Sequence, residues 1–246
     1  MKIIVILRAA ADSASPVRIE QGQVVADSLQ WVLNPFDEAA LAKAVMLRTG
    51  VTTLAVAAIL VAPASHEALL QRTFALGVQR VIHLCTAPPA LEPIVQARQL
   101  LPVLRQERPD LILIGRAVLG DDGADTGAML SALLDCSLAT EALDLHLSAE
   151  EVVVTRATAG GSEELALRLP ALVTAELALA SPRYLTLMEL MAARKKQAEY
   201  VVNPAATAAP LASLALHPVA PRRRGMLLAS VAELAACLRT AIGTLP

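Results

Sequence analysis

Short apolar runs alternate with amphipathic stretches along the first half of the chain. An unbroken apolar run is typical of a strand that is buried on both faces of a sheet. An amphipathic stretch that begins near Pro or Ser and ends near Gly is typical of a helix. These patterns predict strands at residues 2–8, 53–60, 78–84 and 110–114, and helices at residues 35–49, 65–76 and 92–107.

Regular alternation of strand and helix predicts a parallel sheet with helices on both faces, which is the Rossmann-like α/β class. Sheets of this class bind ligands at the carboxyl ends of their strands. We therefore expect a binding site in the loops that follow Arg8, Leu60 and Ile114.

Two β-hairpins are predicted from glycines between short strand-like pieces. Gly22 lies within residues 18–25, and Gly160-Gly161 separates residues 152–156 from residues 165–169. Glycine at such positions permits the backbone angles of a tight turn. The second hairpin marks a change from the alternating pattern of the first half.

The rest of the second half predicts a strand, two helices and an extended arm. The strand is expected at residues 171–177, and the helices at residues 185–196 and 231–242. Between the helices, residues 201–221 are rich in Ala and Pro and lack packing residues, so we expect an extended arm that lies on another chain. The predicted domains are residues 1–196 and the arm with its helix, residues 197–246.

Composition narrows the class of protein. Hydrophobic residues make up 55% of the 246 residues and charged residues 18%, so the chain has ample apolar surface for a core. A net charge of −2 provides no positive field for nucleic acid. The scattered cysteines and histidines suggest neither disulfides nor a metal site. A strand-like N-terminus and a proline-rich arm indicate a cytoplasmic protein without membrane insertion.

The segment from Gly115 to Gly127 follows a predicted strand and precedes a predicted helix. Its four glycines permit close backbone approach, and N–H groups near a helix N-terminus are suited to a phosphate, with Thr126 adding a hydroxyl. Three aspartates oppose a phosphate unless Arg116 or a cation offsets them. The segment is neither a Walker A loop nor GxGxxG. An acidic surface loop explains the same residues equally well.

Two further segments flank the same expected crevice. Asn34-Pro35-Phe36-Asp37 is, in the simplest interpretation, a capped helix start. In the functional interpretation, Asn34 bonds an adenine or a ribose at the mouth of the crevice. The loop Val61-Ala62-Pro63-Ala64 has small residues that would let a nucleotide pack closely, although it is equally consistent with a plain turn.

Residues 182–196 have a candidate surface for a protein partner. Leu187, Leu190 and Met191 fall on one helical face, and Met suits adaptable binding surfaces. Basic residues follow at the helix end, where cations suit the helix dipole. An ordinary amphipathic helix with a basic end is the alternative. We find no nucleophile elbow and no acid–base pair, so no catalytic residue is predicted.

The order and spacing of these motifs resemble the electron transfer flavoprotein β subunit family. The resemblance runs from the first strand to about Lys196 and is most specific from Leu169 onward. It is carried by Asn34-Pro35-Phe36-Asp37, Phe74-Ala75-Leu76-Gly77, residues 110–115, Gly160-Gly161, residues 169–174, Pro182-Arg183-Tyr184 and residues 191–196.

The resemblance implies an adenine-nucleotide α-hydrolase-like fold, paired with a larger α subunit that holds most of the FAD. It also implies a structural AMP in this subunit, and it places Phe36 toward the subunit interface and the flavin. The positions that match the AMP site are Ile6, Asn34, Pro35, Phe36, Asp37, Val61, Gly115, Arg116, Ala117, Val118, Leu119, Gly120, Asp121, Asp122, Gly123, Ala124, Asp125 and Thr126.

The resemblance further implies an electron carrier rather than an enzyme. It would pass electrons from a flavin dehydrogenase to a quinone oxidoreductase or similar acceptor, with Leu187 at the position of the residue that docks into the dehydrogenase. The implied docking residues are Tyr184, Leu187, Leu190, Met191, Arg194, Lys195 and Lys196. Two alternatives stay open: an electron-bifurcating member with a second FAD in this subunit, and a stand-alone adenine-nucleotide-binding stress-type protein.

The chain departs from the usual family pattern at three places. Leu7-Arg8-Ala9-Ala10-Ala11 stands where Val-Lys-Gln-Val-Pro is usual, and Gly115-Arg116-Ala117 where Gly-Lys-Gln is usual. Ala157 stands where Glu is frequent after Arg156.

Overall fold

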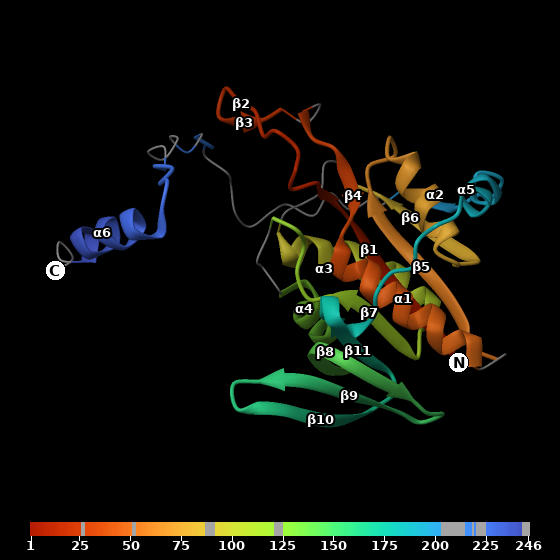
Figure 1. The fold of residues 1–246 in the computed structure, drawn as a ribbon. Coiled ribbons are helices and arrows are strands. Elements are labelled where there is room, and N and C mark those ends of the chain that lie inside the picture. The colour runs from red at the N-terminus through yellow and green to blue at the C-terminus, as the bar shows by residue number, and fades with distance from the viewer. Residues whose placement is uncertain are drawn as a thin grey trace.

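In the computed structural model, a ten-stranded mixed sheet forms the centre of the molecule (Figure 1). The structure describes residues 1–25, 28–50, 53–86, 92–120, 125–202, 215–217, 219 and 225–242. The sheet strands are β1 (Lys2–Ala11), β4 (Trp31–Leu33), β5 (Ala55–Ala62), β6 (Arg80–Cys85), β7 (Leu111–Gly115), β8 (Ser137–Leu147), β9 (Glu151–Thr158), β10 (Gly161–Arg168), β11 (Ala171–Ala175) and β12 (Glu199–Val202).

Helices cover both faces of this sheet, and a small hairpin lies outside it. The helices are α1 (Pro35–Gly50), α2 (Glu67–Ala75), α3 (Pro93–Glu107), α4 (Asp125–Leu134), α5 (Leu187–Ala193), α6 (Val231–Ile242) and the short 3-10 helix η2 (Leu177–Leu179). The hairpin, predicted around Gly22, consists of β2 (Ile19–Glu20) and β3 (Gln23–Val24).

The strand order is β10-β9-β8-β11-β7-β1-β5-β6-β12, with β4 paired to β1. The seven strands β8, β11, β7, β1, β5, β6 and β12 each pair in parallel with their neighbours in this order. At the β8 edge, β9 and β10 add an antiparallel hairpin. The Rossmann-like class predicted from the alternation is therefore confirmed.

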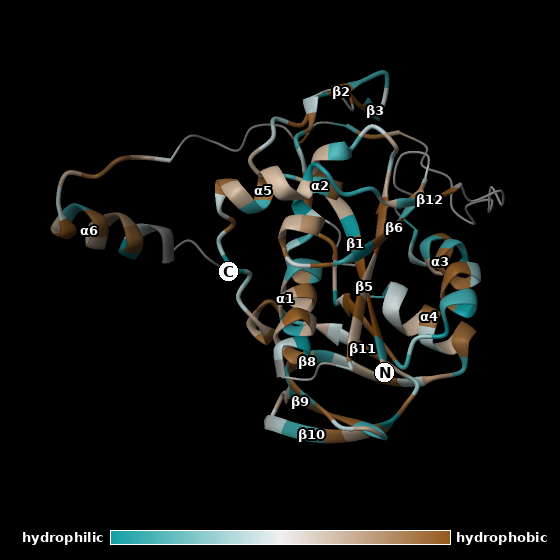
Figure 2. Ribbon diagram, turned by 90° about the vertical axis from the view of Figure 1, so that its right-hand side faces the viewer, coloured by the Kyte–Doolittle hydropathy of each residue, from teal (hydrophilic) through white to brown (hydrophobic). Residues whose placement is uncertain are grey.

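The apolar run of β1 is explained by burial on both faces. Ile3, Val5 and Leu7 pack into the core under α1, α2 and α5, whereas Ile4 and Ile6 pack into the core under α3 and α4. Figure 2 shows the central strands of the sheet as a largely hydrophobic layer. Helices α1, α2 and α5 lie on one side of this layer, and α3 and α4 lie on the other.

Several boundaries differ from the predicted ones for local reasons. Strand β1 continues to Ala11 because its last residues pair with β4 in antiparallel fashion. The strand predicted at 171–177 ends at Ala175, since Glu176 accepts a hydrogen bond from the Leu177 N–H and begins η2. Helix α5 begins at Leu187 because Thr186 caps its N-terminus, and it ends at Ala193, before the basic residues.

Strand β8 was not predicted because a β-bulge interrupts the alternation of buried and exposed residues along it. Its pairing register shifts between Ala142 and Asp144, and Glu141 has a φ of 59°. The buried side chains Ala139, Ala142 and Leu145 are consequently three residues apart, which is a helical rather than a strand spacing.

The predicted arm begins as a strand of the sheet. Strand β12 pairs in parallel with β6, and Arg80 Nη2 lies 2.7 Å from Glu199 Oε2. Arg80 also binds Glu107, and hydrogen bonds from Arg80 and Lys2 lower the pKa of Glu107 to about 2.

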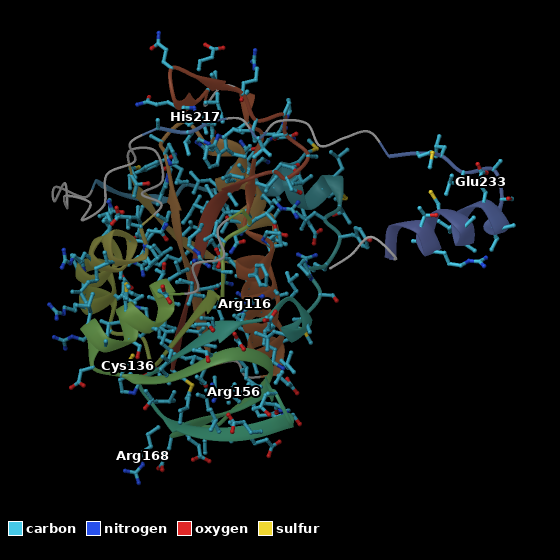
Figure 3. The ribbon with its side chains drawn as sticks, turned by 90° about the vertical axis from the view of Figure 1, so that its left-hand side faces the viewer. Arg116, Cys136, Arg156, Arg168, His217 and Glu233 are labelled. Carbon is cyan, nitrogen blue, oxygen red and sulfur yellow. The ribbon has the colours of Figure 1, made fainter. Side chains whose placement is uncertain are left out.

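Farther along the chain, α6 has the predicted bounds and stands away from the sheet (Figures 1 and 3). Among the described helices, none has both the length and the apolar character needed to cross a membrane.

Candidate functional site

The carboxyl ends of three parallel strands bring the predicted loops together. Arg8 of β1 is in register with Val61 of β5, and Ile6 is in register with Ile114 of β7. Gly115, the last residue of β7, therefore lies close to Leu7 and Arg8 of β1. This edge is where an open α/β sheet binds its ligands.

The Asn34 side chain ties the start of α1 to the loop after β7. Asn34 is fully buried, and its Nδ2 donates to the Ala117 carbonyl at 2.7 Å. Its Oδ1 accepts from the Leu119 N–H at 3.2 Å. We refer to the described part of this loop, residues 115–120, as the β7 loop.

Asp37 and Arg8 form a buried ion pair beside the same loop. Asp37 Oδ2 accepts from the Arg8 N–H at 2.8 Å and from Arg8 Nε at 3.0 Å. Asp37 Oδ1 accepts from Arg8 Nη2 at 2.8 Å and from the Gly115 N–H at 2.6 Å. Arg8 Nη2 also donates to the carbonyls of Gly115, at 2.7 Å, and Ala117, at 3.1 Å. We call Arg8, Asn34 and Asp37 the loop clamp.

Gly115 is required by the close approach of α1. A Cβ atom at this position would lie 2.5 Å from Asp37 Oδ1 and 2.5 Å from Phe36 Cβ, which is closer than non-bonded atoms approach. Gly120, at the end of the β7 loop, has a φ of +84°, a conformation that glycine adopts without strain.

Arg116 of the β7 loop lies against Phe36, at the start of α1. Its guanidinium lies 5.3 Å from the centre of the Phe36 ring and forms an ion pair with Glu176. The Arg116 N–H donates to the Ala175 carbonyl at 3.0 Å, which holds the loop against β11. Figure 3 shows Arg116 at the middle of the body, well away from α6. Arg116 thus fixes the half-buried Phe36 ring.

The start of α4 closes the other side of the site. Thr126 is buried in its first turn, whereas Asp125 is exposed. Gly127 allows α4 to approach β11, because a Cβ there would lie 2.6 Å from Thr174 Cγ2. The remaining predicted positions, Asp121, Asp122, Gly123 and Ala124, lie outside the described residues.

The described candidate residues therefore lie around one edge of the sheet. Ile6, Val61 and Ala117 contribute buried apolar surface, while Val118 and Leu119 are half-buried. In open α/β sheets, ligands bind outside the carboxyl ends of the strands, and these residues lie at such an edge. Sequence reasoning missed Arg8 as a site residue, although a charge within a long apolar run was a signal.

A second candidate surface, on and before α5, exposes apolar side chains. Tyr184 is 100% exposed, Leu187 74% and Met191 58%, and Met188 beside them is 81% exposed. Leu190 differs from the sequence expectation of a shared outward face, because it is half-buried and packs against the core. The exposed apolar row is thus Leu187, Met188 and Met191.

Local contacts attach this apolar surface to α2. Thr186 and Glu189 form a reciprocal capping box, and Arg183 binds Glu189 and the Ala75 carbonyl at 3.0 Å. Hydrogen bonds from the Thr186 N–H and from Arg183 lower the pKa of Glu189 to about 2. Lys196 Nζ lies 3.3 Å from the Val78 carbonyl. Arg194 and Lys195 are exposed beside this anchored lysine.

The strand order and the helices on both faces of the sheet define an α/β protein of the Rossmann-like class. Residues 22–206 match the electron transfer flavoprotein domain. The chain belongs to the family of electron transfer flavoprotein β subunits.

Three relatives carry the name electron transfer flavoprotein subunit beta. The Bradyrhizobium diazoefficiens protein is 34% identical over an alignment of 253 positions, which covers 100% of both chains. The human protein is 35% identical over 207 residues, 82% of this chain and 81% of its own. The mitochondrial protein of Oryza sativa subsp. indica is 34% identical over 201 residues, 80% of this chain and 79% of its own.

Proposed function

We propose that this chain is the β subunit of a heterodimeric electron transfer flavoprotein. With a larger α subunit it would carry electrons from a flavin dehydrogenase to a quinone oxidoreductase or similar acceptor. The observation that carries the proposal is the similarity to the Bradyrhizobium subunit over the full length of both chains. The cytoplasmic location expected from the sequence is part of the proposal.

In this proposal, the crevice at the carboxyl edge of the sheet holds a structural AMP. The features that support it are the β7 loop, the buried apolar side chains Ile6 and Val61, and the start of α4 with Thr126. Small residues and backbone N–H groups fit an adenine nucleotide better than they fit a metal ion, which would require several carboxylate or imidazole ligands.

The FAD is held mainly by the α subunit in this proposal and supplies the reversible uptake of electrons. The residues of this chain would orient it and exclude water. Phe36 is suited to that role because the Arg116 guanidinium and the turn at the start of α1 fix its ring at the rim of the crevice.

Two surfaces of this chain are proposed to bind proteins. The exposed row of Leu187, Met188 and Met191 would dock the dehydrogenase, since apolar anchors on a rigid support are typical of interface hot spots. The arm and α6 would lie on the α subunit. Val231, Leu234 and Leu238 of α6 are 84%, 46% and 50% exposed, so this apolar face is open to a partner.

Cofactor content tests the proposal directly. The chain is co-expressed with the α subunit, the complex is purified and denatured, and the released cofactors are quantified by chromatography. One FAD and one AMP per heterodimer would support the proposed carrier. Two FAD and no AMP would replace it by an electron-bifurcating protein. A chain that forms no complex and carries no flavin would refute it and favour a stand-alone nucleotide-binding protein.

A further inference from the structure

We propose that the loop clamp, Arg8, Asn34 and Asp37, consists of positioning residues that shape the β7 loop rather than contact the nucleotide. This inference rests on the proposed nucleotide site, and it changes the role that the family resemblance implies for Asn34 and Asp37. It follows from where their polar atoms are already bound.

The Asp37 carboxylate has no capacity left for a ligand. Each of its oxygens accepts two hydrogen bonds, and all four donors belong to Arg8 and Gly115. Asp37 is fully buried, and its charge is compensated by the Arg8 guanidinium, whose side chain is 4% exposed. A carboxylate saturated in this way is unsuited to accept from a ribose hydroxyl or an adenine amino group.

The Asn34 amide is likewise directed into the protein. Its Nδ2 and the Arg8 Nη2 both donate to the Ala117 carbonyl, and its Oδ1 accepts from the Leu119 N–H. With Asp37 bound to the Gly115 N–H, the clamp makes side-chain hydrogen bonds to Gly115, Ala117 and Leu119 of the β7 loop. Asn34 is fully buried beneath these contacts.

Several loop amides are therefore satisfied before any ligand binds. The Gly115 N–H binds Asp37, the Arg116 N–H binds the Ala175 carbonyl, and the Leu119 N–H binds Asn34. A bound nucleotide must therefore contact other atoms of the loop. The hydrogen bonds of the clamp hold those atoms in place. A loop that is already ordered loses little conformational entropy when the nucleotide binds. The clamp therefore increases the affinity for the nucleotide without contacting it.

The test compares loop order with nucleotide affinity in the heterodimer after its nucleotide has been removed. Variants Asp37→Asn and the milder Arg8→Lys are measured beside Asp144→Asn, which removes the charge of an ion pair with Lys43 that lies outside the loop clamp. Hydrogen exchange is followed by mass spectrometry in peptides spanning the β7 loop, with a β5 peptide as reference for global opening. AMP affinity is measured by titration calorimetry, and FAD content by absorbance.

We expect both clamp variants to speed exchange of the β7 loop in nucleotide-free protein about tenfold, with β5 affected less. AMP should bind about tenfold more weakly, and saturating AMP should restore the wild-type exchange of the loop. FAD content should stay unchanged, as should every quantity in Asp144→Asn. Because Arg8→Lys keeps the charge pair, it provides a readout even where Asp37→Asn fails to fold.

Weaker AMP binding with wild-type exchange of the nucleotide-free loop would overturn the inference, because that pattern identifies direct ligand contacts. Unchanged affinity in both variants would also overturn it. A wild-type complex that binds no AMP would instead refute the proposed AMP site. In that case, faster loop exchange in the variants would still support the clamp as the device that orders the loop.

Discussion

Arg8 illustrates how one charged side chain can be accommodated in an apolar strand. It is 3% exposed within β1, and its guanidinium is bound by one carboxylate and two backbone carbonyls. Removing one partner of a buried ion pair leaves an uncompensated charge, which is strongly destabilising. The site is therefore organised around a polar network that is complete without a ligand.

Replacing Gly115 by Ala should destabilise the protein. The added Cβ would lie 2.5 Å from Asp37 Oδ1, so either α1 or the β7 loop must move. We expect a loss of about 1–3 kcal/mol in the free energy of unfolding, measured by denaturant titration. Gly160→Ala is the matched control, because a Cβ there meets open space. Equal stabilities of the two variants would contradict the close packing.

His83 should make stability depend on pH. It is fully buried on β6, and desolvation lowers the pKa of its imidazole from 6.5. The unfolded chain then binds a proton at a higher pH than the folded one, so stability falls as the pH drops below about 6.5. His83→Gln should flatten this fall in denaturant unfolding between pH 7 and the folded-state pKa. Identical pH profiles for wild type and His83→Gln would contradict this account.

The individual contacts of the site were beyond sequence reasoning. Asn34 and Asp37 could be recognised at a helix start, and Gly115 as a residue of close approach. Arg8 and Asp37 are 29 residues apart, and Asn34 and Ala117 are 83 apart. Such pairs are set by strand register and helix placement, which hydrophobic periodicity does not specify.

Among the elements, α5 is distinguished by exposed apolar side chains on a firmly held support. Its capping box and the Arg183 contact to α2 restrain a helix of only seven residues. A rigid support lowers the entropy lost on docking, so exposed leucine and methionine side chains are effective there.

Leu187→Ala should impair docking without affecting the flavin. The side chain is 74% exposed, so its loss should cost the fold little, while the apparent KM for the dehydrogenase should rise about tenfold. The measurement is steady-state electron transfer at sub-saturating dehydrogenase, with bound FAD determined in parallel. Met46→Ala, which truncates a 61% exposed side chain on α1, is the control. Unchanged transfer in Leu187→Ala would refute the anchor assignment.

Most elements could be predicted because their signals are local. Apolar runs gave the central strands, and Pro35 with Gly77 marked helix ends. Strand β8 was missed because its bulge spaces buried residues like a helix. Strand β12 was missed because four residues within an arm show no periodicity, and their pairing depends on the distant Arg80 and on β6.

For the whole molecule, the main feature is a sheet-based body with a helix that stands apart from it. Figure 1 shows α6 beyond the sheet and its covering helices. An amphipathic helix with an exposed apolar face is stabilised mainly by packing against another surface. The fold of this chain therefore supports the proposal of a partner subunit.

Changing Leu234 and Leu238 together to Gln should weaken the heterodimer. Gln keeps good helix propensity, so the change removes apolar surface while α6 can still form. We expect the dissociation constant for the α subunit to rise at least about tenfold, measured by analytical ultracentrifugation. Arg239→Gln on the same helix should leave it unchanged. A double variant with wild-type affinity would place the contact with the α subunit elsewhere.

The attachment of the arm through β12 has a mechanical consequence. A pull along the axis of β12 would load its ladder with β6 in shear, so that its hydrogen bonds resist together rather than opening one after another. The ion pairs of Arg80 with Glu199 and Glu107 reinforce this junction at the opposite end of β12 from the arm. A force that reached β12 from the proposed partner subunit would thus be transmitted to the sheet as tension.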